Sequence, residues 1–246
     1  MRFGFTLAAV AALSAPVALV AKDAASPVIA KALADPARAD QQVDDDRRKA
    51  AALVAFSELK PGQAVVDFFP GRGYWTRIFT GVVGPKGHIY AIFPAAAAQY
   101  AAKSVPALQA RNLANVTAAV DPAIITVPAP VDLVWTVENY HDVANDGGGE
   151  AAITAVNAAA FKALKPGGLY VVVDHVAPAG SGLANTDTTH RIDPAIVKKQ
   201  VLAAGFQWVG ESKALANPAD DHTLKVFDPA IRGHTDQFIY KFRKPK

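Results

Sequence analysis

The sequence predicts an α/β fold in which a doubly wound, mostly parallel sheet of about seven strands carries helices on both faces. Short apolar runs alternate with longer helical patterns along most of the chain, which is typical of parallel strand–helix–strand units. The first apolar run leads into the turn Phe69-Pro70-Gly71-Arg72-Gly73 and then a helical pattern, an arrangement that lets a backbone approach a small ligand. A length of 246 residues with 51% hydrophobic content suits one such domain.

The N-terminus has the features of a secretory leader. Residues 1–21 carry Arg2, then an almost unbroken apolar stretch with small residues near its end. This pattern predicts a signal peptide, and hence a periplasmic or secreted protein with no stable membrane insertion after leader removal. We assign residues 22–43 to a linker and the start of an N-terminal helix, and residues 44–246 to the main domain. The chain has no cysteine, which excludes disulfides and thiolate metal sites.

The remaining elements follow in a regular order. A helix is predicted over residues 40–59, with Asp44–Asp46 in its first turn and Lys60-Pro61-Gly62 after its end. Strands are predicted at residues 64–68, 88–93, 115–120, 131–137, 169–174, 206–212 and 237–242. Further helices are predicted at residues 74–83, 95–103, from 147–149 to 164, and from Asp193-Pro194 to 205. Residues 214–236 are too long for a simple connection and predict a lid or a site loop.

The charge pattern argues against nucleic-acid binding. Lys and Arg number 25 against 22 Asp and Glu, a net charge of +3, and the basic residues are scattered. The run Arg47-Arg48-Lys49 and the basic C-terminus are typical of a solvated surface. We therefore expect a small-molecule substrate as the partner, and the sequence leaves the oligomeric state open.

Polar residues gather where predicted strands end. Asp67, Glu138, His141, Asp142, Asp174 and His175 all lie at or just after such ends, and ligands of open α/β sheets bind at this edge. His141, with Asp142 or Glu138, is the best candidate for a general base and is expected to face the glycine turn. The alternative for each histidine is a structural, hydrogen-bonded role.

These side chains could instead bind a divalent metal ion. Imidazole and carboxylate ligands suit zinc, manganese or iron, and the candidates are His141, Asp174, His175, His190 and His222. No pair of them has the spacing of a known metal motif, so the sequence does not favour a metal site. Serine hydrolase chemistry is not favoured either, because the chain lacks a Gly-x-Ser-x-Gly turn.

Three motifs resemble those of the class I S-adenosylmethionine-dependent methyltransferases. They are residues 61–70 with Gly71-Arg72-Gly73, Asp132-Leu133-Val134, and Leu164-Lys165-Pro166-Gly167-Gly168. More narrowly, four segments resemble an exported bacterial subgroup labelled predicted methyltransferases: Gly73 to Arg77, Glu138 to Asp142, His190 to Asp193, and Asp220 to Thr223. The resemblance covers about Asp44 to Phe242. It implies a Rossmann-like sheet of order 3-2-1-4-5-7-6 with an antiparallel last strand.

The resemblance also implies S-adenosylmethionine as the cofactor. Asp67 and the backbone at Pro70, Gly71 and Gly73 would hold its methionine part, and Tyr74 is a candidate for stacking. Asp121 would lie near the adenine, and Glu138 and Asn139 would line the reaction centre.

The chain departs from the family pattern at two places. Phe69 stands where the motif has its first glycine, and Ile92-Phe93-Pro94 stands where an acidic residue holds the ribose. The expected function is methyl transfer to an unidentified small substrate. The alternatives are a repurposed fold whose His/Asp cluster performs metal-assisted or acid–base chemistry, or a periplasmic binding protein for a nucleoside-like ligand.

Overall fold

Seven strands form one sheet in the computed structural model, which describes residues 26–246. The strands are β1 (Ala64–Phe68), β2 (His88–Pro94), β3 (Val116–Asp121), β4 (Val131–Val137), β5 (Leu164–His175), β6 (Gln207–Ser212) and β7 (Gln237–Arg243). Their order is β3-β2-β1-β4-β5-β7-β6. Strand β7 runs antiparallel to β5 and β6, and the other neighbours are parallel. The predicted fold class, strand order and antiparallel last strand are confirmed.

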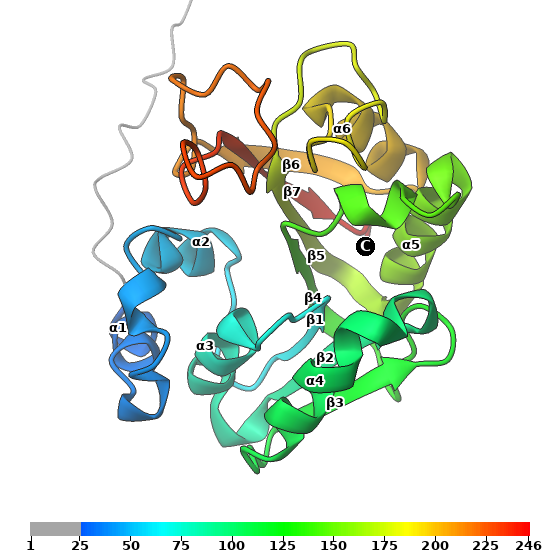
Figure 1. Cartoon of the computed structure of the whole chain (residues 1–246). Helices are drawn as coiled ribbons and strands as arrows, with labels where there is room; N and C mark the ends of the chain where they lie inside the picture. The colour runs from blue at the N-terminus through cyan, green and yellow to red at the C-terminus, as the bar shows by residue number, and fades with distance from the viewer. Residues whose placement is uncertain (1–25) are drawn as a thin grey trace, which may run out of the picture.

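Helices cover both faces of this sheet (Figure 1). The α-helices are α1 (Pro27–Leu33), α2 (Ala50–Phe56), α3 (Tyr74–Val83), α4 (Ala98–Gln109), α5 (Gly149–Ala163) and α6 (Pro194–Ala203). Short 3-10 turns are η1 (Pro36–Arg38), η2 (Gln42–Asp44), η3 (Gly84–Lys86), η4 (Ala95–Ala97) and η5 (His141–Ala144). No helix among residues 26–246 is long and apolar enough to cross a membrane.

Alternation along the strands divides the core between the two faces. In β1, Val65 packs with α1, α2 and α3, whereas its neighbour Val66 packs with α5 and α6. Helix α4 packs on the α3 side, against Ala91 and Phe93 of β2. Both faces are therefore buried, as the apolar strand sequences require in a parallel sheet.

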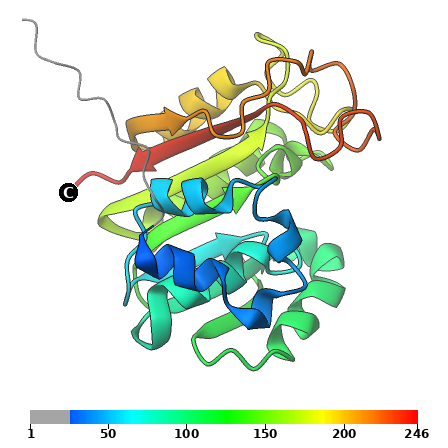
Figure 2. The same cartoon turned by 90° about the vertical axis from the view of Figure 1, so that its left-hand side faces the viewer.

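The loops that could form a site meet at the C-terminal edge of the parallel strands. The glycine turn, residues 69–73, leaves β1 at this edge, and η5 follows the end of β4. The long loops 176–193 and 213–236 lie there too (Figure 2). The backbone N–H of Val226 donates to the carbonyl of Thr189, so these two loops touch.

The N-terminal segment differs from the predicted linker and long helix. Residues 27–33 form α1, which is capped by Ser26 and buries Ile29 and Ala32 in the core on the α3 side. The helix predicted over 40–59 is wrong: only residues 50–56 are α-helical, and Lys49 before them has φ 49°. The acidic residues instead make tertiary ion pairs, Asp45 with Arg38 and Asp40 with Arg77. The predicted signal peptide, residues 1–21, lies outside the described residues.

Candidate functional site

The turn between β1 and α3 contains three residues with left-handed backbone. The φ angle is 56° at Phe69, 54° at Gly71 and 76° at Gly73, a conformation that glycine adopts far more readily than other residues. A Cβ on Gly73 would come 2.3 Å from Cδ2 of Leu108 in α4, so a side chain there would displace the buried Leu108. A Cβ on Gly71 would meet nothing within 4 Å. The backbone at Gly71 therefore borders open space, where a ligand can reach it.

A cavity of about 830 Å³ opens beside this turn, within the size range of small-molecule sites. The N-terminal segment, the glycine turn, α4 and the end of β4 form its walls. Among the predicted site residues, Pro70, Gly71, Tyr74, Glu138 and Asn139 line it. The predicted residues Asp67, Gly73, Asp121, His141 and Asp142 are not part of its lining.

Arg48 and Glu138 place opposite charges on the cavity wall. An Nη1 atom of Arg48 lies 3.6 Å from Oε2 of Glu138, and the two side chains are 24% and 28% exposed. The other carboxylate oxygen of Glu138 accepts a hydrogen bond from Nε2 of Gln237 at 3.1 Å. Both charges can therefore reach a ligand without leaving their partners, and a zwitterion such as an amino-acid group complements the pair.

Tyr74 fastens the N-terminal segment to the glycine turn. Its hydroxyl donates to Oδ1 of Asp45 at 2.6 Å, and the guanidinium of Arg48 lies 4.8 Å from the centre of its ring. Burial, together with the Asp45 carboxylate, raises the pKa of Tyr74 well above its usual value. The hydroxyl thus stays neutral, and the N-terminal segment is fixed as one wall of the cavity.

The position of the missing first glycine is filled by aromatic packing. The ring of Phe69 lies edge-on to Phe68 and to Phe93, with centroids 4.8 Å and 5.9 Å away. Its backbone N–H donates to the carbonyl of Ile92, and its carbonyl accepts from Nδ2 of Asn139 at 3.3 Å. The turn is thereby tied to β2 and β4, and the amide of Asn139 is used in holding it.

Two predicted cofactor-binding carboxylates have structural partners instead. Oδ2 of Asp67 accepts from the Thr76 hydroxyl at 2.6 Å, and burial raises the pKa of Asp67 to about 7, although the Thr76 hydrogen bonds lower it. Asp121 accepts hydrogen bonds from Ala123 and Thr126 in its own loop. Asp67 thus joins β1 to α3, and Asp121 caps the turn after β3, so neither contacts the cavity.

His141 lies in a second cluster, at the ends of β4 and β5. Its Nδ1 lies 2.8 Å from Oδ1 of Asp174, and its backbone N–H donates to the other oxygen of that buried carboxylate. Its Nε2 lies 3.2 Å from Oδ1 of Asp142 and 3.3 Å from Nδ1 of His190. The expectation that His141 faces the glycine turn is wrong, because the ring points toward β5 and the loop before α6.

The charge on His141 follows from these neighbours. Burial lowers the pKa of His141, but the carboxylates of Asp174 and Asp142 outweigh burial and raise this pKa to about 10. In the same pair, burial raises the pKa of Asp174, and the charge and hydrogen bonds of His141 outweigh that and lower it. The neighbouring carboxylates therefore favour the protonated form of the His141 ring, which donates hydrogen bonds rather than accepting them.

The other histidines have separate partners, so the Asp/His neighbours in sequence are mostly not pairs in space. His175 bonds through Nδ1 to the Thr235 hydroxyl at 2.7 Å, and burial lowers the pKa of His175. Nε2 of His222 lies 3.0 Å from Oδ2 of Asp236. His190 joins His141, and it does so beside Asp142 rather than Asp193. The ring of His175 also lies near His141, with centroids 6.0 Å apart.

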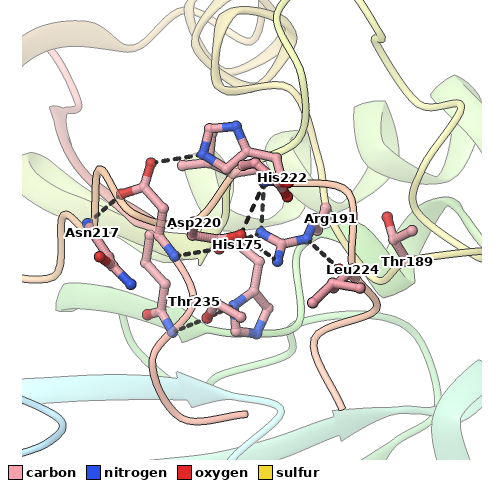
Figure 3. Close-up of polar contacts among 12 residues, drawn as sticks. His175, Thr189, Arg191, Asn217, Asp220, His222, Leu224 and Thr235 are labelled. Atoms are coloured by element: carbon pink, nitrogen blue, oxygen red, sulfur yellow. Dashed lines mark hydrogen bonds and ion pairs between the residues drawn. The ribbon is translucent and has the colours of Figure 1, made fainter. Parts of the chain in front are cut away.

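The loop over residues 213–236 is anchored by a buried ion pair (Figure 3). The guanidinium of Arg191 meets the Asp220 carboxylate at 2.9 Å and 3.1 Å and also donates to the carbonyls of Val176 and Leu224. Both side chains of the pair are at most 2% exposed. The loop, predicted to be a lid or a site loop, is thus fixed to the segment before α6.

Sequence reasoning missed Arg48, because its run of basic residues was interpreted as solvated surface. The signal that could have indicated Arg48 is the group of acidic residues just before it. Asp45 and Asp40 pair with the buried Arg38 and Arg77, and these ion pairs hold the N-terminal segment against the domain. The sequence analysis also did not identify the part of the cavity wall that α4 forms. Four residues on one side of this helix line the cavity: Tyr100, Lys103, Ser104 and Ala107.

No model of a known protein family matches the sequence, and no curated protein matches it. Solved structures do match. A SAM-dependent methyltransferase from Aquifex aeolicus has a TM-score of 0.52 and 17% identity, covering 87% of this chain and 96% of its own. A chain from the complex of the Haloferax volcanii Trm112 methyltransferase activator with a candidate methyltransferase has a TM-score of 0.59 and 15% identity, covering 89% and 98%. The 4+2 cyclase SpnF has a TM-score of 0.53 and 17% identity, covering 81% and 80%. The likeness shows the fold, which is that of the class I methyltransferases.

Proposed function

We propose that this chain, which has the fold of class I S-adenosylmethionine-dependent methyltransferases, transfers a methyl group from that cofactor to a small substrate. One observation carries the proposal: the cavity beside the glycine turn is bordered by bare backbone at Gly71 and by the charged pair Arg48 and Glu138. The fold comparison supports the reaction class. The position of the cavity, at the C-terminal edge of the parallel strands, agrees with where ligands bind in open α/β sheets.

The residues of the cavity fit one end of the cofactor better than the other. Arg48 would hold the carboxylate of the methionine part, and Glu138 would hold its ammonium group. At the ribose end, β2 finishes with Phe93 and Pro94 rather than an acid, and the Phe69 ring packs there. Two hydroxyls without a carboxylate partner weaken binding by about 1–3 kcal/mol each if they are left unpaired.

When bound, S-adenosylmethionine supplies an electrophilic methyl group. Of the three predicted catalytic residues, Glu138 is the one that lines the cavity. Its carboxylate, which Gln237 orients through the bond to Oε1, would hold the ammonium group and thereby position the cofactor. Tyr74 offers an aromatic face beside Arg48.

A repurposed fold is the second candidate function. The match to a 4+2 cyclase is consistent with it, because the same architecture carries a different reaction there. In that case the cavity binds another small molecule, and the cluster around His141 performs the chemistry. Binding of S-adenosylmethionine separates the two candidates.

The protein also has a proposed place of action outside the cytoplasm. The leader pattern of residues 1–21 supports export to the periplasm or secretion. Intact mass of protein from a native extract tests this, because a mature chain starting between residues 22 and 27 is expected. A chain that keeps Met1 in the cytosolic fraction would overturn it.

Calorimetry with S-adenosylmethionine and its demethylated product tests the cofactor assignment. Arg48→Ala and Glu138→Gln each remove a charged partner, and loss of one such bond is expected to weaken binding by about 10- to 150-fold. Lys31→Ala is the control, since Lys31 is an exposed basic residue of α1 and is not part of the cavity lining. No binding of either ligand at millimolar concentration to folded wild-type protein would refute the proposal.

A further inference from the structure

We propose that His141, Asp142 and His190 bind one divalent metal ion of the zinc type. One potential ligand atom from each residue lies at the corner of a nearly equilateral triangle. Nε2 of His141 is 3.3 Å from Nδ1 of His190 and 3.2 Å from Oδ1 of Asp142, and the third side is 3.5 Å. The three residues come from η5 and from the loop before α6, so the fold itself assembles the set.

The lengths of these sides match the ligand spacing of a tetrahedral zinc site. Bonds from zinc to nitrogen and oxygen ligands are about 2.0–2.2 Å, and a tetrahedron with such bonds has ligand atoms about 3.3–3.6 Å apart. An octahedral ion with bonds of about 2.1 Å, as preferred by magnesium, would draw neighbouring ligands to about 3.0 Å. The observed separations therefore suit a tetrahedral ion, zinc or its substitute cobalt(II).

Asp174 supplies the support that histidine ligands of metals usually have. Its buried carboxylate accepts from Nδ1 of His141 at 2.8 Å and from the His141 backbone N–H at the same distance. This bond fixes the ring and leaves Nε2 on the side where Asp142 and His190 lie. The carboxylates of Asp174 and Asp142 together also balance the two charges of the ion.

The other two ligands are held in place as well. His190 has a left-handed φ of 55°, which is unfavourable for a residue other than glycine, and its ring packs on Phe227 with centroids 4.9 Å apart. Nδ2 of Asn145 lies 3.3 Å from Oδ1 of Asp142. The side chains of His190 and Asp142 are 20% and 37% exposed, so an ion can enter and a fourth position stays open for water or a substrate oxygen.

Hydrogen bonding alone explains this arrangement less completely. Nε2 of His141 carries one hydrogen at most, yet it has two partners at nearly equal distances. A metal ion at the centre would contact all three atoms. Because coordination requires unprotonated ligand atoms, the affinity for Zn²⁺ should fall as the pH is lowered.

The test uses the purified protein stripped with a chelator and dialysed free of it. Calorimetric titration with Zn²⁺ is expected to give one saturable site, and Co²⁺ is expected to give the intense visible bands of a tetrahedral complex. Absence of a saturable site for Zn²⁺ would overturn the proposal, as would the weak spectrum of six-coordinate cobalt. S-adenosylmethionine is absent from these titrations, so their outcome is independent of the proposed methyl transfer.

Variants assign the site to these residues. His190→Ala and Asp142→Asn, at the two partly exposed positions, are expected to weaken Zn²⁺ binding by about 100-fold or more. Asp174→Asn should cost about 10- to 100-fold, as loss of an outer partner does. His88→Ala is the matched control, because His88 lies at the start of β2, away from the cluster, where it bonds to Thr117 of β3. Circular dichroism verifies folding, and unchanged Zn²⁺ binding in folded His190→Ala and Asp142→Asn would refute the site.

Discussion

The ring of Phe69 packs edge-on against the ring of Phe93, with centroids 5.9 Å apart and planes at 71°. The two residues stand at the ends of neighbouring strands, β1 and β2, where the proposed cofactor would place its ribose. A single contact thus links the two positions at which the sequence departs from the methyltransferase motifs that it resembles, the absent glycine and the absent acid. Phe69, which has a left-handed backbone conformation, is therefore the first residue to substitute.

Phe69→Gly should strengthen binding of the demethylated cofactor product by about tenfold, because the change removes a ring from the crevice and suits a φ of 56°. Loss of a half-buried ring should lower the free energy of unfolding by about 1–3 kcal/mol. Calorimetry and urea unfolding measure the two effects. Phe69→Leu, which still fills the space, is the control and should show little gain. Equal affinities in the wild type and both variants would show that the ring does not restrict the site.

The two glycines of the turn should respond differently to alanine. Gly73→Ala drives a Cβ into Leu108 and is expected to cost about 2–4 kcal/mol of stability. Gly71→Ala meets no atom within 4 Å and should cost only about 1–2 kcal/mol, for the left-handed backbone. Chemical unfolding of the pair measures the difference. Similar losses in both variants would contradict the packing role of Gly73.

Arg191→Met should loosen the loop over residues 213–236. It leaves the buried carboxylate of Asp220 without its partner, which typically costs about 3–5 kcal/mol. Hydrogen exchange should rise in this loop more than in β1, and Arg191→Lys, which keeps the charge but not the paired bonds, should give a smaller effect. Uniform exchange across both regions would mean that the ion pair does not anchor the loop.

The fold could be predicted closely because its signals are local. Buried parallel strands are continuous apolar runs, and β1, β2, β4 and β7 begin and end within about one residue of their predicted limits. The helix over residues 40–59 could not be predicted correctly, because its acids and bases suit a helix as well as they suit tertiary partners. Arg38 and Arg77 take Asp45 and Asp40, and this pairing is invisible in the sequence.

The site was predicted only in part because side-chain direction is not local information. Asp174 and His175 are neighbours on a strand, yet Asp174 bonds to His141 whereas His175 bonds to Thr235. His190 is 49 residues from His141, so no spacing rule joins them. The predicted residues Pro70, Gly71, Glu138 and Asn139 line the cavity because strand ends share an edge, whereas Arg48 reaches it through the folded N-terminal segment.

Asp67 should make stability depend on pH, in a direction opposite to that of a salt-bridged acid. Burial raises its pKa to about 7 in the folded protein, opposed by the Thr76 hydrogen bonds, against about 3.9 for an unfolded chain. The folded state therefore holds the proton more tightly. The contribution of this group to stability is greatest below about pH 4, falls as the pH rises to about 7, and is constant above that.

Asp67→Asn cannot ionise and keeps an acceptor for the Thr76 hydroxyl, so it should remove this dependence. The stability of the variant relative to wild type should rise by about 2–3 kcal/mol between pH 5 and pH 8, by urea unfolding. Thr76→Val is expected to have the opposite effect. It removes the hydroxyl that lowers the pKa of Asp67, so the stability of this variant should fall more than that of wild type as the pH rises to 8. If the free energies of unfolding of wild type and Asp67→Asn depend on pH in the same way, the Asp67 carboxyl does not change its proton occupancy on folding. The effect of burial on its pKa would then be balanced by the hydrogen bonds that it accepts from Thr76.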